Sequence, residues 1–467
     1  MFRRLNDVLR PASPAERDTG FSLVEVIVAM MVFTIISIGV AYTITNSLVL
    51  TRESRARAIA TQLAAQDIDL LRSVKDVFTI VDKTWTTEVG GTTYEVTRRA
   101  SWATTTSNTT ICGTGTGTLQ YKQVEVSVSY AGMRPGGEIT SATAIAPNSR
   151  INDPNKGTIV VEVLGASGTG TSGVTVQIAA ATDSPNGAVA PPTPAKTDST
   201  GCTYALGLAA GNYQVTISKG GAVGPDQKST QVMTPVVVTA GTSQTASFSF
   251  DTAASFNASV GREQALLRTL PTNLDLTFRS SAQGDYTVAA SAASPVPLFP
   301  FTGGYSVMAG RHIDPTTDPK NNVESSCLNV DPSAWTTPAA DGMVGAQIMP
   351  VGAAPGDSAV PIVPTGVVQL ADLPGVQRVA AVQQNSKANG DPGCVTGQTY
   401  YFPSVTALTA MALPYGTWKF YTYNTSNSGT VFTLKDQITP RGDAARTRGI
   451  VDTTAKTVLL DPRGGTP

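Results

Sequence analysis

Residues 20–51 read GFSLVEVIVAMMVFTIISIGVAYTITNSLVLT, and this stretch decides how the chain begins to fold. From Val26 to Thr51 it contains no charged residue and no proline, and Gly39 is the only glycine. As a helix rising ~1.5 Å per residue, this uncharged run is about 39 Å long, which exceeds the roughly 30 Å hydrocarbon core of a bilayer. The stretch therefore predicts one membrane-spanning helix.

Three other interpretations compete for this run. A secretory signal peptide has an apolar region of roughly 7–15 residues followed by small residues at its cleavage site, and this run is longer and lacks such a site. A buried core helix is usually shorter than this run. A generic signal anchor has the right length, but it gives no reason for an acidic residue within the apolar face, and Glu25 lies there.

Glu25 is the informative residue of this segment. A carboxylate inside a membrane costs on the order of 2–3 kcal/mol or more and marks a functional site by default. If the chain were cut between Gly20 and Phe21, the new α-amino group of Phe21 would have a pKa of ~7.7–8 and would be cationic. Between helices staggered by one turn, this amine of one copy can meet Glu25 of the next and neutralise two charges that a low dielectric penalises. We therefore interpret Glu25 as a device that sets the register of assembly.

The sequence GFSLVEVIVAM, which follows a short polar and basic leader at residues 1–20, resembles the N-terminus of type IV pilins and of the pseudopilins of type II secretion systems. The resemblance implies that a prepilin peptidase cuts between Gly20 and Phe21, that Phe21 is then N-methylated, and that Glu25 serves subunit assembly. It also implies that other pilin subunits and an assembly platform in the membrane are partners. The resemblance covers roughly residues 17–75.

The orientation of the helix in the membrane is implied by this resemblance and not by the charges. The leader contains four arginines, but Arg52, Arg55 and Arg57 follow the helix directly, so the positive-inside bias is weak. The resemblance implies a single-pass protein of the cytoplasmic membrane with its N-terminus inside before assembly. After assembly it implies an extracellular position at the cell surface, as part of a pilus.

Residues 52–152 predict an α+β head beyond the membrane helix 21–51. Apolar residues recur at helical spacing through 52–77, which indicates that the helix continues and packs one side on a sheet, although Asp67 interrupts the apolar arc. Two β-prone runs flank Gly90-Gly91, which is typical of a hairpin. A further run ending at Tyr130 alternates apolar and polar residues and predicts a half-buried strand.

Residues 153–251 predict a β-sandwich. Strand-like runs occur at 157–164 and 173–181 and again up to Asp251, with frequent turn signals between them. The motif Gly211-Asn212-Tyr213-Gln214-Val215 resembles the prealbumin-like modules of surface adhesins, which are related to carboxypeptidase-regulatory-like domains. In such modules the glycine precedes a strand whose aromatic residue fills the core, and the module acts as a stalk or binding platform.

Residues 252–467 predict a β-rich C-terminal domain of short strands and long loops rich in proline, glycine and aspartate. Gly416-Thr417-Trp418-Lys419-Phe420 echoes the motif at 211–215, which suggests a second and more elaborate sandwich. The predicted fold class is therefore an α+β pilin-like N-terminal part followed by all-β sandwich modules. The loop at 311–365 is long for a compact domain and is either a binding loop or mobile.

Composition excludes several function classes. The chain has 467 residues, of which 14% are charged against the roughly 25% of an average protein, and its formal net charge is −1. This balance argues against binding to a nucleic acid, and no basic run lies outside the leader. A single histidine argues against histidine-based catalysis and against a multi-histidine metal site. No cofactor is expected.

Four cysteines fit an oxidising exterior and allow three pairings. Cys327 and Cys394 share the last predicted domain, so we expect them to bond first. Cys112 and Cys202 would then remain and would link the predicted head to the first sandwich. The alternative is that one of these pairs is free. No CxxC motif is present, so neither metal binding nor thiol catalysis has support.

The sequence contains no GxSxG, P-loop or HExxH motif, and we expect no enzyme. His312, with Asp314 and Asp318 nearby, can be imagined as a base–acid pair or a calcium site, but a loop shaped by Asp-Pro steps explains it better. Two functions remain. One is a low-copy pilin at the tip of a filament that displays its distal modules to a surface ligand, with a pseudopilin as a variant. The other is a membrane-anchored adhesin that does not polymerise.

Overall fold

The computed structural model describes residues 22–105, 109–114, 117–147, 153–260, 268–289, 295–315, 326–370, 373, 375–407, 409–422, 438–440 and 448–464. The chain divides into two compact units, and the statements below concern each unit by itself. Unit 1 contains the chain up to Ala100 together with Gln123–Ile145. Unit 2 contains Ser101–Lys122 and everything from Ala146 onward.

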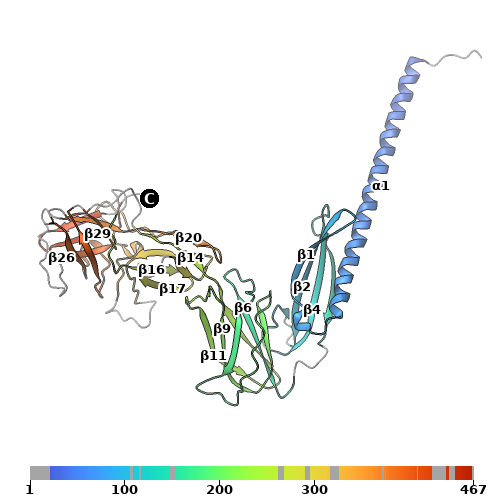
Figure 1. The fold of residues 1–467 in the computed structure, drawn as a ribbon. Coiled ribbons are helices and arrows are strands. Elements are labelled where there is room, and N and C mark those ends of the chain that lie inside the picture. The colour runs from blue at the N-terminus through green and yellow to red at the C-terminus, as the bar shows by residue number, and fades with distance from the viewer. Residues whose placement is uncertain are drawn as a thin grey trace, which may run out of the picture. The chain divides into compact units, whose positions relative to one another are not determined.

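Unit 1 begins with a single long helix, α1, which runs from Leu23 to Arg72 (Figure 1). The Ser22 side chain caps it by accepting a hydrogen bond from the backbone N–H of Val24 at 3.3 Å, and Ser73 ends it. At ~1.5 Å per residue the helix is about 75 Å long. It ends before the predicted limit at residue 77. A separate 3₁₀ turn, η1 (Val77–Thr79), follows, and the Asp76 side chain caps it by accepting from the N–H of Phe78.

The buried side of α1 lies entirely in its distal half. Ala60, Ala64, Ile68 and Leu71 are buried there, at the helical spacing that the sequence predicted, and α1 contacts β5 (Ile139–Ile145). Asp67 lies on the same side and is also buried. The residues of α1 before this arc have no covering layer among the described residues.

The sheet that faces α1 has the order β1-β2-β4-β5, with β3 (Thr109–Thr110) paired to β2. Strands β1 (Lys83–Val89) and β2 (Thr92–Thr104) form the predicted antiparallel hairpin. Gly90 and Gly91 both have positive φ, at 61° and 76°, as a two-residue type I′ turn requires. In β4 (Leu119–Tyr130) alternate residues are buried, which gives the sheet its apolar face.

The first part of unit 2 after Ala146 is a β-sandwich of two three-stranded sheets. One sheet has the order β12-β6-β8, from Ser243–Ser249, Gly157–Leu164 and Cys202–Leu208. The other has the order β11-β9-β7, from Thr230–Val238, Gly211–Ser218 and Thr175–Ala180. Valine, isoleucine and aromatic side chains from both sheets form one core, so the chain adopts the sandwich expected here. Strand β12 runs parallel to β6, and the other pairs within these two sheets are antiparallel. Two short strands, β10 (Ala222–Val223) and β13 (Asp251–Thr252), form a separate antiparallel pair.

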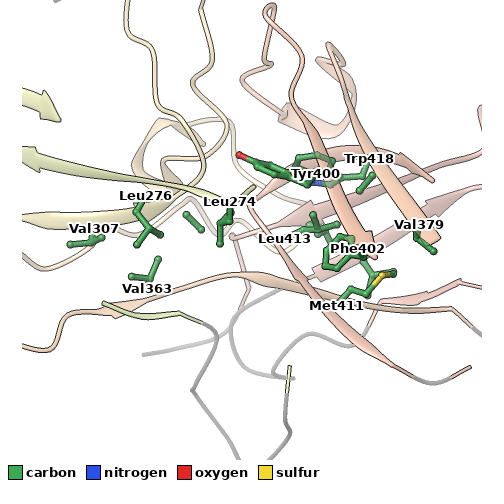
Figure 2. Packing of buried hydrophobic residues seen from close by; sticks show 14 of the residues in the cluster. Leu274, Leu276, Val307, Val363, Val379, Tyr400, Phe402, Met411, Leu413 and Trp418 are labelled. Atoms are coloured by element: carbon green, nitrogen blue, oxygen red, sulfur yellow. The ribbon is translucent and has the colours of Figure 1, made fainter. Parts of the chain in front are cut away.

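The rest of unit 2 is also β-structure and shares one hydrophobic core (Figure 2). Its first half contains a sheet of β16 (Asp275–Ser280), β17 (Gly284–Ala289) and β19 (Ser306–Ala309). Shorter strands accompany it: β14 (Ala254–Phe256), β15 (Ser259–Val260), β18 (Val296–Leu298), β20 (Ser358–Ala359) and β21 (Ile362–Val363). Figure 2 shows Leu276 and Val307 of this half in the same cluster as Phe402 and Trp418 of the next.

The second half contains two further sheets. The first has the order β25-β22-β27, from Ala410–Leu413, Gly366–Leu370 and Ile438–Pro440. The second has the order β24-β23-β26-β29-β28, from Thr399–Val405, Gln377–Gln384, Gly416–Thr422, Thr457–Asp461 and Arg448–Asp452. The pairing of β22 with β25 and of β23 with β26 repeats the pairing of β6 with β8 and of β7 with β9.

The two glycine motifs that resemble each other in sequence, at 211–215 and 416–420, occupy equivalent places. Gly211 opens β9 at φ 155° and Gly416 opens β26 at φ 124°, where a side chain is strained. A Cβ atom on Gly211 would lie 2.3 Å from the backbone nitrogen of Ala188, and one on Gly416 would lie 2.4 Å from Nδ2 of Asn329. Each glycine is followed two residues later by a fully buried aromatic side chain. The motif therefore marks the start of a core strand in both places.

Candidate functional site

The N-terminal end of α1 holds the sequence-predicted assembly residue. Glu25 lies in the first turn of the helix, three residues after the Ser22 cap. The partial positive charge of a helix N-terminus favours a carboxylate in this turn. The predicted cleavage residues Gly20 and Phe21 lie outside the described residues. The structure therefore places Glu25 on the helix, while the cut and the methylation stay predictions.

The first half of α1 presents an apolar surface on all sides. Its large side chains are exposed, with Leu23 at 78% and Phe33 at 72%, and this exposure continues to Leu50. Among the described helices, Leu23–Arg72 is the one long and apolar enough to cross a membrane. An apolar surface of this kind is stable only in lipid or against other apolar surfaces.

The threonines in this half form hydrogen bonds within the helix. The hydroxyl groups of Thr34, Thr45 and Thr51 donate to the carbonyl oxygens of Met30, Ala41 and Ser47, at 2.7, 2.8 and 2.7 Å. These threonines therefore need no partner outside the helix, as a lipid environment requires. Glu25 differs from them, because it is the only ionisable side chain before Arg52 in the described part of α1 apart from the phenol of Tyr42.

A buried ion pair fixes the other half of α1 to the sheet. The guanidinium of Arg98 on β2 donates two hydrogen bonds to the carboxylate of Asp67, one from Nε to Oδ2 at 2.9 Å and one from Nη2 to Oδ1. The two side chains are only 11% and 5% exposed. The guanidinium also lies 5.4 Å from the centre of the Trp85 ring. Asp67 interrupts the apolar arc because it pairs with Arg98. Helical spacing alone does not reveal this partner on β2.

Both disulfide bonds lie within unit 2. One joins Cys327 to Cys394 and the other joins Cys112 to Cys202, which are the pairs favoured from the sequence. Cys112 belongs to the segment Ser101–Lys122, which groups with unit 2 and not with the helix. The second bond therefore ties this segment to β8 of the first sandwich. All the cysteines of the chain are thus oxidised, and none is a nucleophile.

A buried polar network stands beside the Cys327–Cys394 bond. Asp391 accepts from Nδ2 of Asn329 at 3.0 Å and from the hydroxyl of Thr417 at 2.7 Å. Gln383 donates to Asn329 at 2.8 Å. Burial raises the pKa of Asp391 above its ordinary value, and the donated hydrogen bonds only partly oppose this. The network holds the loop at 385–394 against β26 and serves a structural role.

His312 lies among charged residues that the sequence did not connect with it. Its Nδ1 is 2.5 Å from Oδ2 of Asp285, and its ring also contacts Nη2 of Arg279. Asp318 lies outside the described residues, and no group of three potential metal ligands occurs in the described part of the chain. The ring is thus held by Asp285 and Arg279. The loop shaped by Asp-Pro steps, which the sequence favoured, continues outside the described residues and stays a prediction.

Arg279 and Asp285 were not singled out from the sequence, although the hairpin turn between them was a signal that could have found them. They are directly opposite each other in the β16–β17 hairpin, whose turn precedes Gly284, and the Nε–Oδ1 distance is 2.8 Å. Arg279 also pairs with Asp331 at 2.5 Å. Burial alone would raise the pKa of Asp285, but hydrogen bonds from His312 and Arg279 outweigh burial and hold that pKa below its ordinary value.

Comparison with known proteins identifies the N-terminal segment. A family described as "Prokaryotic N-terminal methylation motif" matches residues 17–41, which include Gly20, Phe21 and Glu25. The match covers the start of the chain only. No curated protein matches the chain.

Several solved structures resemble parts of the chain weakly. The Bacillus anthracis TIE protein is 10% identical, with 76% of this chain and 70% of that one covered and a TM-score of 0.17. A streptococcal ancillary pilin is 10% identical, with 47% and 71% covered and a TM-score of 0.18. BcpA, the major pilin subunit of Bacillus cereus, is 12% identical, with 62% and 96% covered and a TM-score of 0.18. At these TM-scores the matches carry no argument about fold or function.

Proposed function

We propose that the chain is a pilin-type subunit that enters the membrane by α1 and then joins a pilus or pseudopilus. A prepilin peptidase removes residues 1–20, Phe21 becomes the methylated N-terminus, and an assembly platform in the membrane draws the helix into the filament. The role is structural and not enzymatic. The methylation motif at residues 17–41 supports the processing steps.

The proposal rests on one observation. The first half of α1 is an apolar helix without a covering layer in the described structure, and it has a single carboxylate near its start. The apolar surface suits lipid before assembly and the core of a helical filament afterwards. Glu25 is out of place in both settings unless a cation meets it. The cationic amine of Phe21 on a neighbouring subunit would supply that charge at a fixed axial offset, and so set the register of the subunits.

The size of the chain favours a low-copy subunit at the filament tip. We propose that 21–51 is the membrane and assembly helix, that 52–152 is the head, and that 153–251 and 252–467 are display modules. About 300 residues beyond the head would crowd a thin filament if every subunit carried them. At the tip the same modules are free to contact a surface ligand, and the disulfides suit an extracellular position.

The processing step is tested by mass spectrometry of the mature chain. We expect the first residue to be Phe21 carrying an added N-methyl group. An intact Met1, or a new N-terminus beyond residue 40, would contradict the proposal, because either result removes the amine that Glu25 requires.

The assembly step is tested by Glu25→Gln, with Glu53→Gln as the matched control. Glu53 lies on the same helix beyond the uncharged run, where it pairs with Arg57 at 3.8 Å. We expect Glu25→Gln to reduce recovery in sheared filaments at least ~10-fold while membrane insertion is unchanged, and Glu53→Gln to behave as wild type. Equal incorporation of both variants would instead favour an adhesin that is anchored in the membrane and does not polymerise.

A further inference from the structure

An open cavity of about 990 Å³ lies in unit 2, beside the sheet of β16, β17 and β19. Its volume is at the upper end of the ~300–1,000 Å³ usual for ligand pockets. Most such pockets are lined by apolar and aromatic side chains, whereas most residues that line this one have polar side chains. Among the described lining residues, Ile313 and Pro350 are the two large apolar side chains, and none is phenylalanine, tyrosine or tryptophan.

Charged side chains of fixed position form one wall of the cavity. Arg279 is held by Asp285 at 2.8 Å and by Asp331 at 2.5 Å, and His312 is held by Asp285 at 2.5 Å. These groups come from β16, β17 and two loops, so they are rigid before any ligand arrives. The Arg279 and Asp285 side chains stay 32% and 20% exposed, and each can therefore offer a donor or an acceptor to a ligand.

Neutral hydrogen-bonding groups line other parts of the cavity. Ser281, Gln283 and Gln347 line it and have no hydrogen-bond partner among the residues that the structure describes. An amide both donates and accepts, and so does a hydroxyl. The cavity thus presents a mixture of donors and acceptors to a ligand.

The balance of charge argues against a charged ligand. The lining holds the guanidinium groups of Arg279 and Arg311 as well as the carboxylates of Asp285 and Asp314. An anion would therefore meet carboxylates, and a cation would meet guanidinium groups. An uncharged ligand with many hydroxyl groups avoids both penalties, because a hydroxyl donates to a carboxylate and accepts from a guanidinium. Its C–H faces could lie against Ile313 and Pro350.

We propose that this cavity binds a neutral pyranose unit of a glycan. Arg279 and Asp285 would pair with adjacent hydroxyl groups, while Gln283 and Gln347 would bond to others. The inference is independent of how the subunit assembles, because the cavity lies far along the chain from α1. If it holds, the distal module recognises a carbohydrate surface.

The test uses the full chain in a polyoxyethylene detergent, since detergents with sugar headgroups would compete. The probes are printed neutral oligosaccharides ending in glucose, galactose, mannose or N-acetylglucosamine, together with sialylated and sulfated counterparts. We expect binding to at least one neutral group and little change between about 0.1 and 1 M salt, where charge-driven contacts weaken. Binding only to the acidic probes, or to none, would overturn the proposal.

Two variants locate the binding. Gly303 lines the cavity at a φ open to other residues, and its Cβ position is 3.7 Å from the nearest atom, so Gly303→Leu fills the cavity without a backbone clash. Gly220→Leu is the control, because Gly220 lies in the first sandwich with open space around it. We expect at least a ~10-fold loss of affinity for Gly303→Leu and none for the control.

A second variant keeps the test valid if Gly303→Leu fails to fold. Gln283 and Gln347 are exposed and do not support the fold, so the double variant Gln283→Ala/Gln347→Ala should fold normally. We expect it to weaken binding several-fold while the thermal unfolding midpoint is unchanged. Unchanged affinity in both Gly303→Leu and the double variant would place any glycan binding elsewhere and reject this site.

Discussion

Single acidic residues carry much of the specific information in this chain. Glu25 and Asp67 both interrupt apolar positions of the same helix, yet only Asp67 has a partner in the described structure, which is Arg98. A buried carboxylate with a bidentate guanidinium is a local clamp. Glu25 has no such partner among the described residues, and we propose that a neighbouring subunit supplies one. On this proposal the same type of residue serves the fold in one place and assembly in the other.

The contribution of the Arg98–Asp67 pair to stability can be measured by comparing a substitution of Arg98 with one of the adjacent Arg99. Removing one partner of a buried pair usually costs about 3–5 kcal/mol, because the other charge stays buried and unpaired. We expect Arg98→Met to lower the free energy of unfolding of unit 1 by that amount. Arg99 is exposed, so Arg99→Met should change it by less than ~0.5 kcal/mol. Denaturant titration followed by hydrogen exchange of β2 measures both, and similar losses would show that the clamp contributes nothing special.

Asp285 predicts a pH dependence of stability in the distal module. Its pKa in the folded chain lies below the ordinary value of roughly 3.9, so its stabilising effect is present above about pH 4 and is lost as the pH falls through the folded pKa. The gap in denaturation midpoint between wild type and Asp285→Asn should therefore shrink as the pH is lowered from about 7 to about 3. The exposed Asp183, changed to Asn, serves as the control and should show no such gap.

At the scale of elements, alternation and glycine placement predicted the strands well. The run at 157–164 became β6 and the motif at 211–215 opened β9, because alternate Val, Ile and Tyr side chains enter one core. The Gly90-Gly91 hairpin also formed as predicted. The parallel pairing of β12 with β6 could not be predicted, because pairing between distant strands depends on the whole fold. The cluster of Arg279 with His312 likewise joins residues 33 apart in sequence, and no local pattern links them.

The Cys327–Cys394 bond should stabilise the distal module. It closes a loop with a sequence separation of 67, and loss of such a native bond typically costs about 2–5 kcal/mol. We expect the double variant Cys327→Ser/Cys394→Ser to raise hydrogen exchange in β23 and β26. The matching variant Cys112→Ser/Cys202→Ser should leave exchange there unchanged. Equal effects of the two variants would mean that the bonds act on the chain as a whole.

At the scale of the molecule, different parts of the chain suit different environments. The first half of α1 has exposed apolar side chains, while one side of its second half is buried against a sheet. The rest of the described chain is mainly β-structure with cores of its own. Membrane attachment should therefore reside in the first half of α1 alone. The sequence predicted this division because charge is absent from 26–51 and returns at Arg52.

A chain that begins at residue 52 tests this division. It keeps the buried arc from Ala60 to Leu71 and loses the exposed apolar surface. We expect it to remain in the supernatant after high-speed centrifugation, with both disulfides formed, whereas the full chain sediments with membranes. Continued sedimentation after a carbonate wash would show that another part of the molecule binds lipid.

The Cys112–Cys202 bond would have a mechanical consequence if, as we propose, the chain is anchored in the membrane at one end and binds a target at the other. Its two cysteines are 90 residues apart, so the covalent path can pass directly from one to the other. At ~3.3–3.6 Å per extended residue, about 300 Å of chain is thereby withheld from stretching. Under tension the load would bypass β4, β5, β6 and β7, which could keep their hydrogen bonds while the rest of the tether is pulled taut.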